Sequence, residues 1–144
     1  MEVKTLKNYT LVCQTEERDC GLASLNMLLL YYGETFSLDY LKELCNYKNL
    51  EMDFYNLSLI AQALGYTSNA YHINDLNDIC HTDLPCIAQI EISEEIRHFV
   101  VIFDKNNEHV IIGDPAKKTY TTQICNLNKC FTGYILRIEN KITV

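Results

Sequence analysis

The sequence predicts an α+β fold in a single domain covering residues 1–144. Two observations support this prediction. Residues 20–65 carry three helical patterns, two of which are followed by a glycine that can end a helix, whereas the rest of the chain consists mainly of short β-rich runs separated by turn residues. Helices that precede a set of antiparallel strands are typical of an α+β domain. A chain of 144 residues is also long enough to bury a substantial core.

Helical patterns account for the first half of the chain. The first helix is predicted to begin at Cys20, directly after Asp19, and to stop at Gly33; its residues are so uniformly apolar that we expect a central, buried helix. Ser37 is a suitable N-cap for a second helix, from Leu38 to about Cys45. A third helix is expected over residues 54–64, ended by Gly65.

β-rich runs fill the second half, which is predicted to form an antiparallel sheet. A short helix capped by Asn74 and a helical stretch before the last strand are also expected. We expect strands at residues 66–72, 85–92, 98–104, 108–114, 118–122 and 133–139.

The loop after Asp104 determines which residues of the hairpin face each other. If the loop is the three residues 105–107, Asp104 pairs with Glu108 and His98 falls directly opposite Asp114. A two-residue turn at 106–107 would shift the register by one and put these two side chains on opposite faces.

Composition excludes several classes of protein. The net charge of −7 argues against nucleic acid as a partner, because phosphate binding needs a basic surface. Seven cysteines cannot all pair, and none of them lies at a zinc-ligand spacing. The sequence also lacks a secretion signal and a membrane-spanning run. We therefore expect a cytoplasmic protein with reduced thiols and with neither a metal nor another cofactor.

Four residues suggest thiol chemistry. Cys20 is predicted at the N-terminus of the apolar helix, where the helix dipole favours a thiolate, and Gly21 after it would leave room for a substrate backbone. A carboxylate at Asp114 could orient the imidazole of His98 as a base. The side-chain amide of Gln14 could donate to an oxyanion, although an exposed loop glutamine is the simpler interpretation from spacing alone.

These residues occur in motifs that resemble the C39 bacteriocin-processing peptidases, and the resemblance covers nearly the whole chain. The segment 14–33 (QTEERDCGLASLNMLLLYYG) is similar to the active-site segment of that family. Further matches follow in order at residues 37–41 (SLDYL), 64–66 (LGY), 84–88 (LPCIA), 98–101 (HFVV), 114–116 (DPA) and 132–133 (TG).

The resemblance implies a papain-like cysteine protease with a helical N-terminal half, whose central helix bears the nucleophile, and a C-terminal antiparallel sheet. It implies Cys20 as the nucleophile, His98 as the general base, Asp114 as the residue that orients His98, and Gln14 as the oxyanion donor. The implied reaction removes a leader peptide from a bacteriocin-like precursor after Gly-Gly or Gly-Ala, coupled to export. The usual setting is the cytosolic N-terminal domain of an ABC exporter at the inner face of the membrane.

The family also implies a precursor whose leader docks as an amphipathic helix. Four apolar residues are candidates for the leader-binding groove, although ordinary packing explains each of them equally well: Met27, Met52, Phe54 and Leu57. The possible partners besides the precursor are the transmembrane and ATPase parts of an exporter. Two alternatives stay open, a C39-like module that binds leader or cargo without cleaving it, and a thiol acyltransferase.

Overall fold

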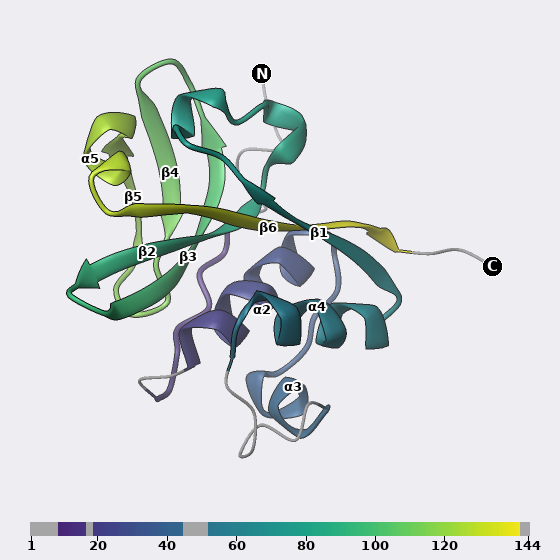
Figure 1. The fold of residues 1–144 in the computed structure, drawn as a ribbon. Helices are drawn as coiled ribbons and strands as arrows, with labels where there is room; N and C mark the ends of the chain where they lie inside the picture. The colour runs from purple at the N-terminus through teal and green to yellow at the C-terminus, as the bar shows by residue number, and fades with distance from the viewer. Residues whose placement is uncertain (1–8, 17–18, 45–51, 142–144) are drawn as a thin grey trace.

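An antiparallel sheet of six strands, with helices packed against it, dominates the part of the chain that the computed structural model describes, residues 9–16, 19–44 and 52–141 (Figure 1). The longer helices are α2 (Cys20–Tyr31), α3 (Leu38–Leu44), α4 (Phe54–Ala63) and α5 (Ile124–Asn128). The strands are β1 (Tyr66–His72), β2 (Cys86–Ser93), β3 (Ile96–Lys105), β4 (His109–Gly113), β5 (Thr119–Gln123) and β6 (Phe131–Lys141). The predicted α+β class is confirmed.

The predicted ends of the three long helices are confirmed wherever the structure describes them. Gly33 and Gly65 follow α2 and α4 with φ of +91° and +96°, a backbone conformation that glycine adopts without strain. The hydroxyl of Ser37 accepts a 3.0 Å hydrogen bond from the backbone N–H of Tyr40, as an N-cap of α3 should. α3 is described as far as Leu44, so its expected end near Cys45 lies outside the described residues.

The expected helix capped by Asn74 is a single 3₁₀ turn, η3 (Leu76–Asp78), and its cap is a different residue. The Asp75 carboxylate accepts a 2.9 Å hydrogen bond from the backbone N–H of Asn77 and a 2.8 Å bond from the side-chain amide of Asn128. Asp75 therefore ties the turn to the end of α5, a distant contact that the local sequence does not reveal.

The sheet has the strand order β1-β6-β2-β3-β4-β5, and all pairs are antiparallel. The predicted hairpin register is wrong. Val101 pairs with Gly113, a β-bulge follows between Ile102 and Asp104, and the ladder gives His98 no partner on β4. The Asn106 side chain fixes this turn by accepting hydrogen bonds from the backbone N–H groups of Glu108 and His109.

Two apolar cores lie on opposite faces of the sheet. The larger core packs α2, buried from Cys20 to Leu29, against Phe99, Val101 and Phe103 of β3, which confirms the predicted central helix. The smaller core lies between the other sheet face and the α5 region. Alternate residues of β3 pack into the two cores, so β3 lies directly against the helix that carries Cys20.

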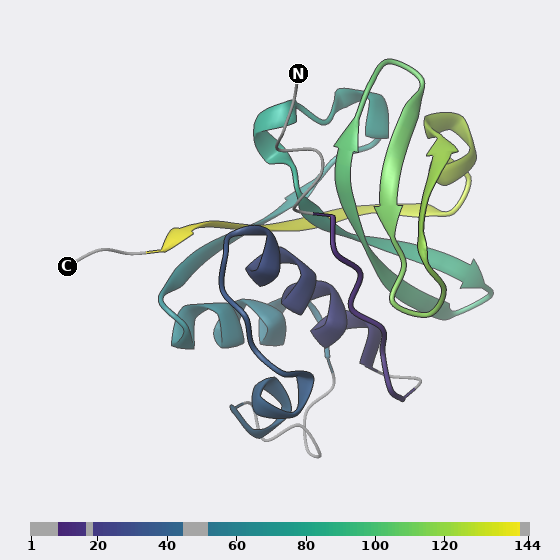
Figure 2. The same cartoon turned by 180° about the vertical axis from the view of Figure 1, so that it is seen from behind.

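The segment 9–16 runs between the helices and the strands β3 and β4 (Figure 2). The Tyr9 hydroxyl donates to the Asp104 carboxylate at 3.1 Å, and the Tyr9 ring stacks on Phe103 with centroids 5.0 Å apart. At its other end, the backbone N–H of Gln14 donates to the Pro115 carbonyl at 2.9 Å. These contacts bring Gln14 to the turn that follows β4.

Candidate active site

Cys20 is the first residue of α2 and is 8% exposed. At this position the unpaired backbone N–H groups and the positive end of the helix dipole favour an anion such as a thiolate. The six cysteines among the described residues are free in the structure. The position therefore suits a nucleophile better than it suits a structural cysteine.

His98 lies on β3 and joins Cys20 to Asp114. Its Nε2 atom is 2.7 Å from Oδ1 of Asp114, and the Cys20 side chain is close enough to the ring to contribute to the raised pKa of His98. Because Nε2 is engaged by Asp114, Nδ1 is the nitrogen that can exchange a proton with the sulfur. The side chains of His98 and Asp114 are 10% and 5% exposed, so water competes little for this bond.

The pKa values of this pair favour a protonated imidazole and an ionised carboxylate. Burial alone would lower the pKa of His98, but hydrogen bonds and charge interactions with Asp114 and Cys20 raise it to about 9. Burial likewise works against ionisation of Asp114, yet the bonds from His98 and from the Ala116 N–H, together with the charges of His98 and Lys117, hold its pKa below the ordinary value. The arrangement thus holds a protonated imidazole between the Asp114 carboxylate and the Cys20 side chain.

Asp114 is held in place by the turn that follows β4. Its Oδ1 accepts from the backbone N–H of Ala116 at 2.9 Å, its own N–H donates to the Lys118 carbonyl, and its carbonyl accepts from the N–H of Lys117. The segment Asp-Pro-Ala therefore forms a hydrogen-bonded turn that fixes the orientation of the Asp114 carboxylate. The contact with His98 arises from this turn and not from the cross-strand pairing expected from the sequence.

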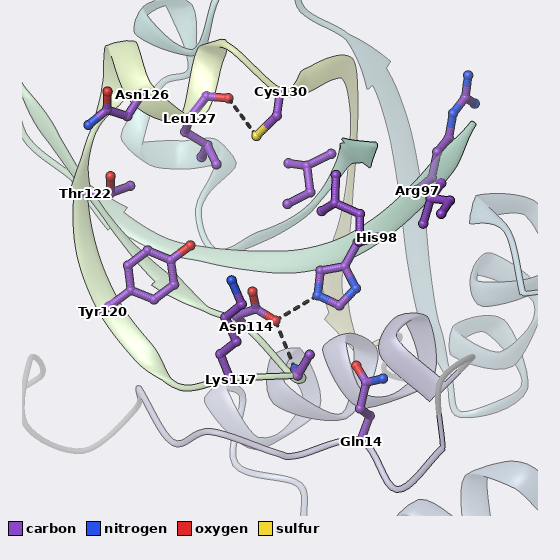
Figure 3. A pocket seen from close by; sticks show the side chains of 14 residues that line it. Gln14, Arg97, His98, Asp114, Lys117, Tyr120, Thr122, Asn126, Leu127 and Cys130 are labelled. Atoms are coloured by element: carbon purple, nitrogen blue, oxygen red, sulfur yellow. Dashed lines mark hydrogen bonds and ion pairs between the residues drawn. The ribbon is translucent and has the colours of Figure 1, made fainter. Parts of the chain in front are cut away.

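Gln14 lies beside the His98–Asp114 pair (Figure 3). Its Nε2 donates to the Glu16 carbonyl at 3.0 Å, which orients the amide within its own loop. An amide nitrogen has two hydrogens, so this orientation is compatible with donation to an oxyanion formed at Cys20. The structure thus brings Gln14 and the catalytic candidates Cys20, His98 and Asp114 to one place.

Asp19 and Lys42 form a buried ion pair that sequence reasoning missed. Asp19 is fully buried and does not cap α2 with its side chain; its Oδ2 instead accepts from the hydroxyl and N–H of Thr15 and from the N–H of Glu16. The Lys42 ammonium, from α3, lies 3.0 Å from the same oxygen. This pair ties the Gln14 loop to the start of α2, so both residues act as positioning residues.

Replacing Lys42 with methionine is expected to destabilise the protein by about 2–3 kcal/mol, because it removes an ammonium group that lies 3.0 Å from the fully buried Asp19 carboxylate. Methionine keeps the apolar stem of the side chain, so packing changes little. Urea unfolding measures the effect, and the double variant Lys42→Met with Asp19→Asn should recover part of it. An unchanged unfolding midpoint in Lys42→Met would contradict this role for the pair.

An apolar wall lies next to Cys20, on the side of Gly21. A Cβ at Gly21 would meet Cγ of Met52 at 3.0 Å and Cδ2 of Phe99 at 3.1 Å, and the Phe54 ring packs on Phe99 with centroids 5.2 Å apart. The expectation that Gly21 leaves room for a substrate backbone is therefore wrong at its Cβ position, since Met52 and Phe99 fill that space.

The four residues expected to form a leader groove have different environments. Met27 and Leu57 are fully buried in the larger core, so a surface groove cannot include them in this conformation. Met52 and Phe54 are only partly buried and pack against that core near Cys20. Only these two stay candidates for contact with a peptide.

No cluster of three metal-ligating side chains occurs within residues 9–16, 19–44 and 52–141. Within those same ranges, no helix has both the length and the apolar character needed to cross a bilayer.

Comparison with known sequences identifies a family. The model of the peptidase C39 family matches residues 8–143. The chain is 28% identical over 130 residues to the lactococcin-G-processing and transport ATP-binding protein LagD of Lactococcus lactis subsp. lactis, which covers 88% of this chain and 18% of LagD. It is 32% identical over 119 residues to the pediocin PA-1 transport/processing ATP-binding protein PedD of Pediococcus acidilactici, a match that covers 82% of this chain and 16% of PedD. The chain therefore spans less than a fifth of these relatives.

Solved structures give the same relationship. The peptidase domain of Streptococcus ComA, a bifunctional ABC transporter involved in quorum sensing, superposes with a TM-score of 0.78 at 26% identity, over 90% of this chain and 97% of that domain. A double glycine motif protease from an AMS/PCAT transporter, solved with its leader peptide, gives 0.77 at 25% identity over 96% of each chain. The papain-like fold implied by the resemblance is confirmed.

Proposed function

We propose that this chain, a cysteine peptidase that belongs to the peptidase C39 family, removes the leader of a bacteriocin-like precursor after Gly-Gly or Gly-Ala. The observation that carries this proposal is the position of His98, whose Nε2 lies 2.7 Å from Asp114 after β4 and whose pKa is raised by Asp114 and by Cys20 at the start of α2. A recognition module that binds without cleaving would have no use for this buried arrangement of thiol, imidazole and carboxylate.

The proposed reaction proceeds through a thioester. The Cys20 thiolate attacks the scissile carbonyl, and the oxyanion is held by the Gln14 amide and by the backbone N–H at the start of α2. The protonated His98, oriented by Asp114, then gives its proton to the leaving amine. Water, deprotonated by His98, releases the acyl group and restores the thiol.

We further propose that the processed peptide is the cargo of an ABC exporter and that the peptidase acts at the cytoplasmic face of the membrane. The relatives' names join processing to transport by an ATP-binding protein, which supports this setting. The precursor's leader is proposed to bind as an amphipathic helix, with Met52 and Phe54 among the residues it contacts. We also propose that residues 1–144 form one peptidase domain, which the family match over residues 8–143 supports.

Mass spectrometry of one reaction tests the proposed activity. A synthetic precursor with an amphipathic leader ending in Gly-Gly should give two products, cut after the second glycine. A matched precursor with leucine in place of that glycine should stay intact, because the residue at the cleaved bond must approach the apolar wall of Met52 and Phe99. Binding without cleavage would favour the recognition module, and a product joined to an added amine would favour the acyltransferase.

A further inference from the structure

A cavity of about 440 Å³ opens beside the His98–Asp114 pair, a volume in the range of small-ligand sites (Figure 3). Its apolar lining comes from elements far apart in the chain: the β2–β3 hairpin on one side, and β5 and α5 on the other. The apolar residues that matter most for the argument are Ile90, Ile92, Ile96, Tyr120 and Leu127. The mechanism proposed above uses none of them.

The chemistry of the leaving group indicates which part of a substrate this cavity faces. His98 donates its proton to the amine that departs, so the chain after the cleaved bond must leave along the His98 side. Among the described residues, the lining includes His98, Asp114 and Gln14, whereas Cys20 and Gly21 contribute nothing to it. The acyl half of the substrate stays on Cys20, beside the closed wall of Met52 and Phe99.

We infer that this cavity binds an apolar side chain from the first two residues of the released peptide. The inference rests on the proposed function and adds a preference on the product side of the cleaved bond. Its lining includes Ile92 and Ile96, which are 60% and 54% exposed, and adjacent exposed apolar side chains can mark a binding site. An apolar side chain seated there would remove this surface from water.

Charge and solvation support the same occupant. Arg97 and Lys117 are exposed residues at the cavity, and the charges of the His98 imidazolium and the Asp114 carboxylate offset each other. The charge of the lining is therefore positive on balance, so a lysine or arginine side chain would be disfavoured. An apolar side chain would also shield the His98–Asp114 bond from water, which strengthens that bond as the proton is transferred.

Three synthetic precursors with one common Gly-Gly leader test the inference. They differ only in the two residues after the glycine pair, which are Leu-Leu, Gly-Gly or Lys-Lys. Competition assays in which two of these precursors share one tube should give a kcat/KM about tenfold higher for Leu-Leu than for Gly-Gly. The kcat/KM for Lys-Lys should be lower than that for Gly-Gly.

Enzyme variants assign that preference to the cavity. Ile96→Ser should reduce the tenfold ratio to about threefold or less, and Tyr120→Ala should act in the same direction. Ile96 is largely exposed, so its replacement leaves folding intact. The matched control Leu59→Ser removes a 43% exposed apolar residue of α4, outside the cavity, and should leave the ratio unchanged.

The outcomes separate this inference from the proposed function. Equal rates for all three peptides, each cut after the second glycine, would overturn the inference and leave the leader peptidase standing. A preference that survives in Ile96→Ser and Tyr120→Ala would also overturn it, because the preference would then arise elsewhere. If no peptide is cleaved, both proposals fail together.

Discussion

Replacing Cys20 with alanine is expected to abolish cleavage of a Gly-Gly precursor, with kcat at least about 10⁴-fold lower, while binding of the leader persists. The loss is large because the Cys20 sulfur is the atom proposed to form the thioester, and alanine has no nucleophilic atom in its place. Cys20 is at the start of a buried helix, where alanine is a good helix former and creates only a small cavity. Product formation by mass spectrometry and leader affinity by fluorescence anisotropy measure the two effects separately.

A second cysteine provides the control for this experiment. Cys125 is an exposed free thiol on α5, so Cys125→Ala removes a thiol without touching the His98 network, and activity should stay at the level of the unmodified protein. Cleavage that continues in Cys20→Ala at a comparable rate would refute the assignment of the nucleophile. Loss of leader binding along with activity would instead show that the variant disturbs the binding surface.

Local sequence signals predicted the elements of this fold well, because glycine ends and polar caps act over a few residues. Gly33, Ser37 and Gly65 all do in the structure what their residue types indicate. The hairpin register failed because it depends on a bulge after Ile102 and on side-chain bonds to Asn106. Neither feature leaves a mark in the alternation of apolar and polar residues.

The candidate site was predicted in part for the right reason. The position of Cys20 at a helix start follows from the apolar pattern, and the structure has it there. The contact between His98 and Asp114 was predicted from a hairpin register that the structure does not have. The family resemblance predicted the same contact without depending on that register. The Asp19–Lys42 pair could not be predicted, because it depends on how α3 packs beside the Gln14 loop.

Replacing Asp114 with asparagine is expected to lower kcat/KM at pH 8 by about 10²–10⁴-fold and to change the shape of the pH profile. With Asp114 present, the pKa of His98 is about 9, so the imidazolium needed to protonate the leaving amine persists until the pH approaches that value. Without the carboxylate, burial dominates and the pKa of His98 falls. The alkaline limb of the profile should therefore move to lower pH, and the defect should be smaller near pH 6 than at pH 8.

Stability should change in a defined pH window as well. A raised pKa of His98 stabilises the folded state fully below its unfolded value of about 6.5 and ceases to do so as the pH passes about 9. The lowered pKa of Asp114 has the opposite pH dependence: it stabilises the folded state above about pH 4 and ceases to do so as the pH falls below that value. The loss of unfolding free energy in Asp114→Asn should thus be greatest between about pH 4 and 6.5, and urea unfolding across this range measures it.

Asp104→Asn is the matched control for both measurements, because Asp104 lies on the same strand as His98 but bonds Tyr9, away from the imidazole. It should leave the alkaline limb where it is in the unmodified protein. If Asp114→Asn also leaves that limb in place, Asp114 does not set the proton affinity of His98, and its role reduces to holding the turn at Ala116. A moved limb with a stability loss confined to the expected window would tie both effects to the single 2.7 Å bond between His98 and Asp114.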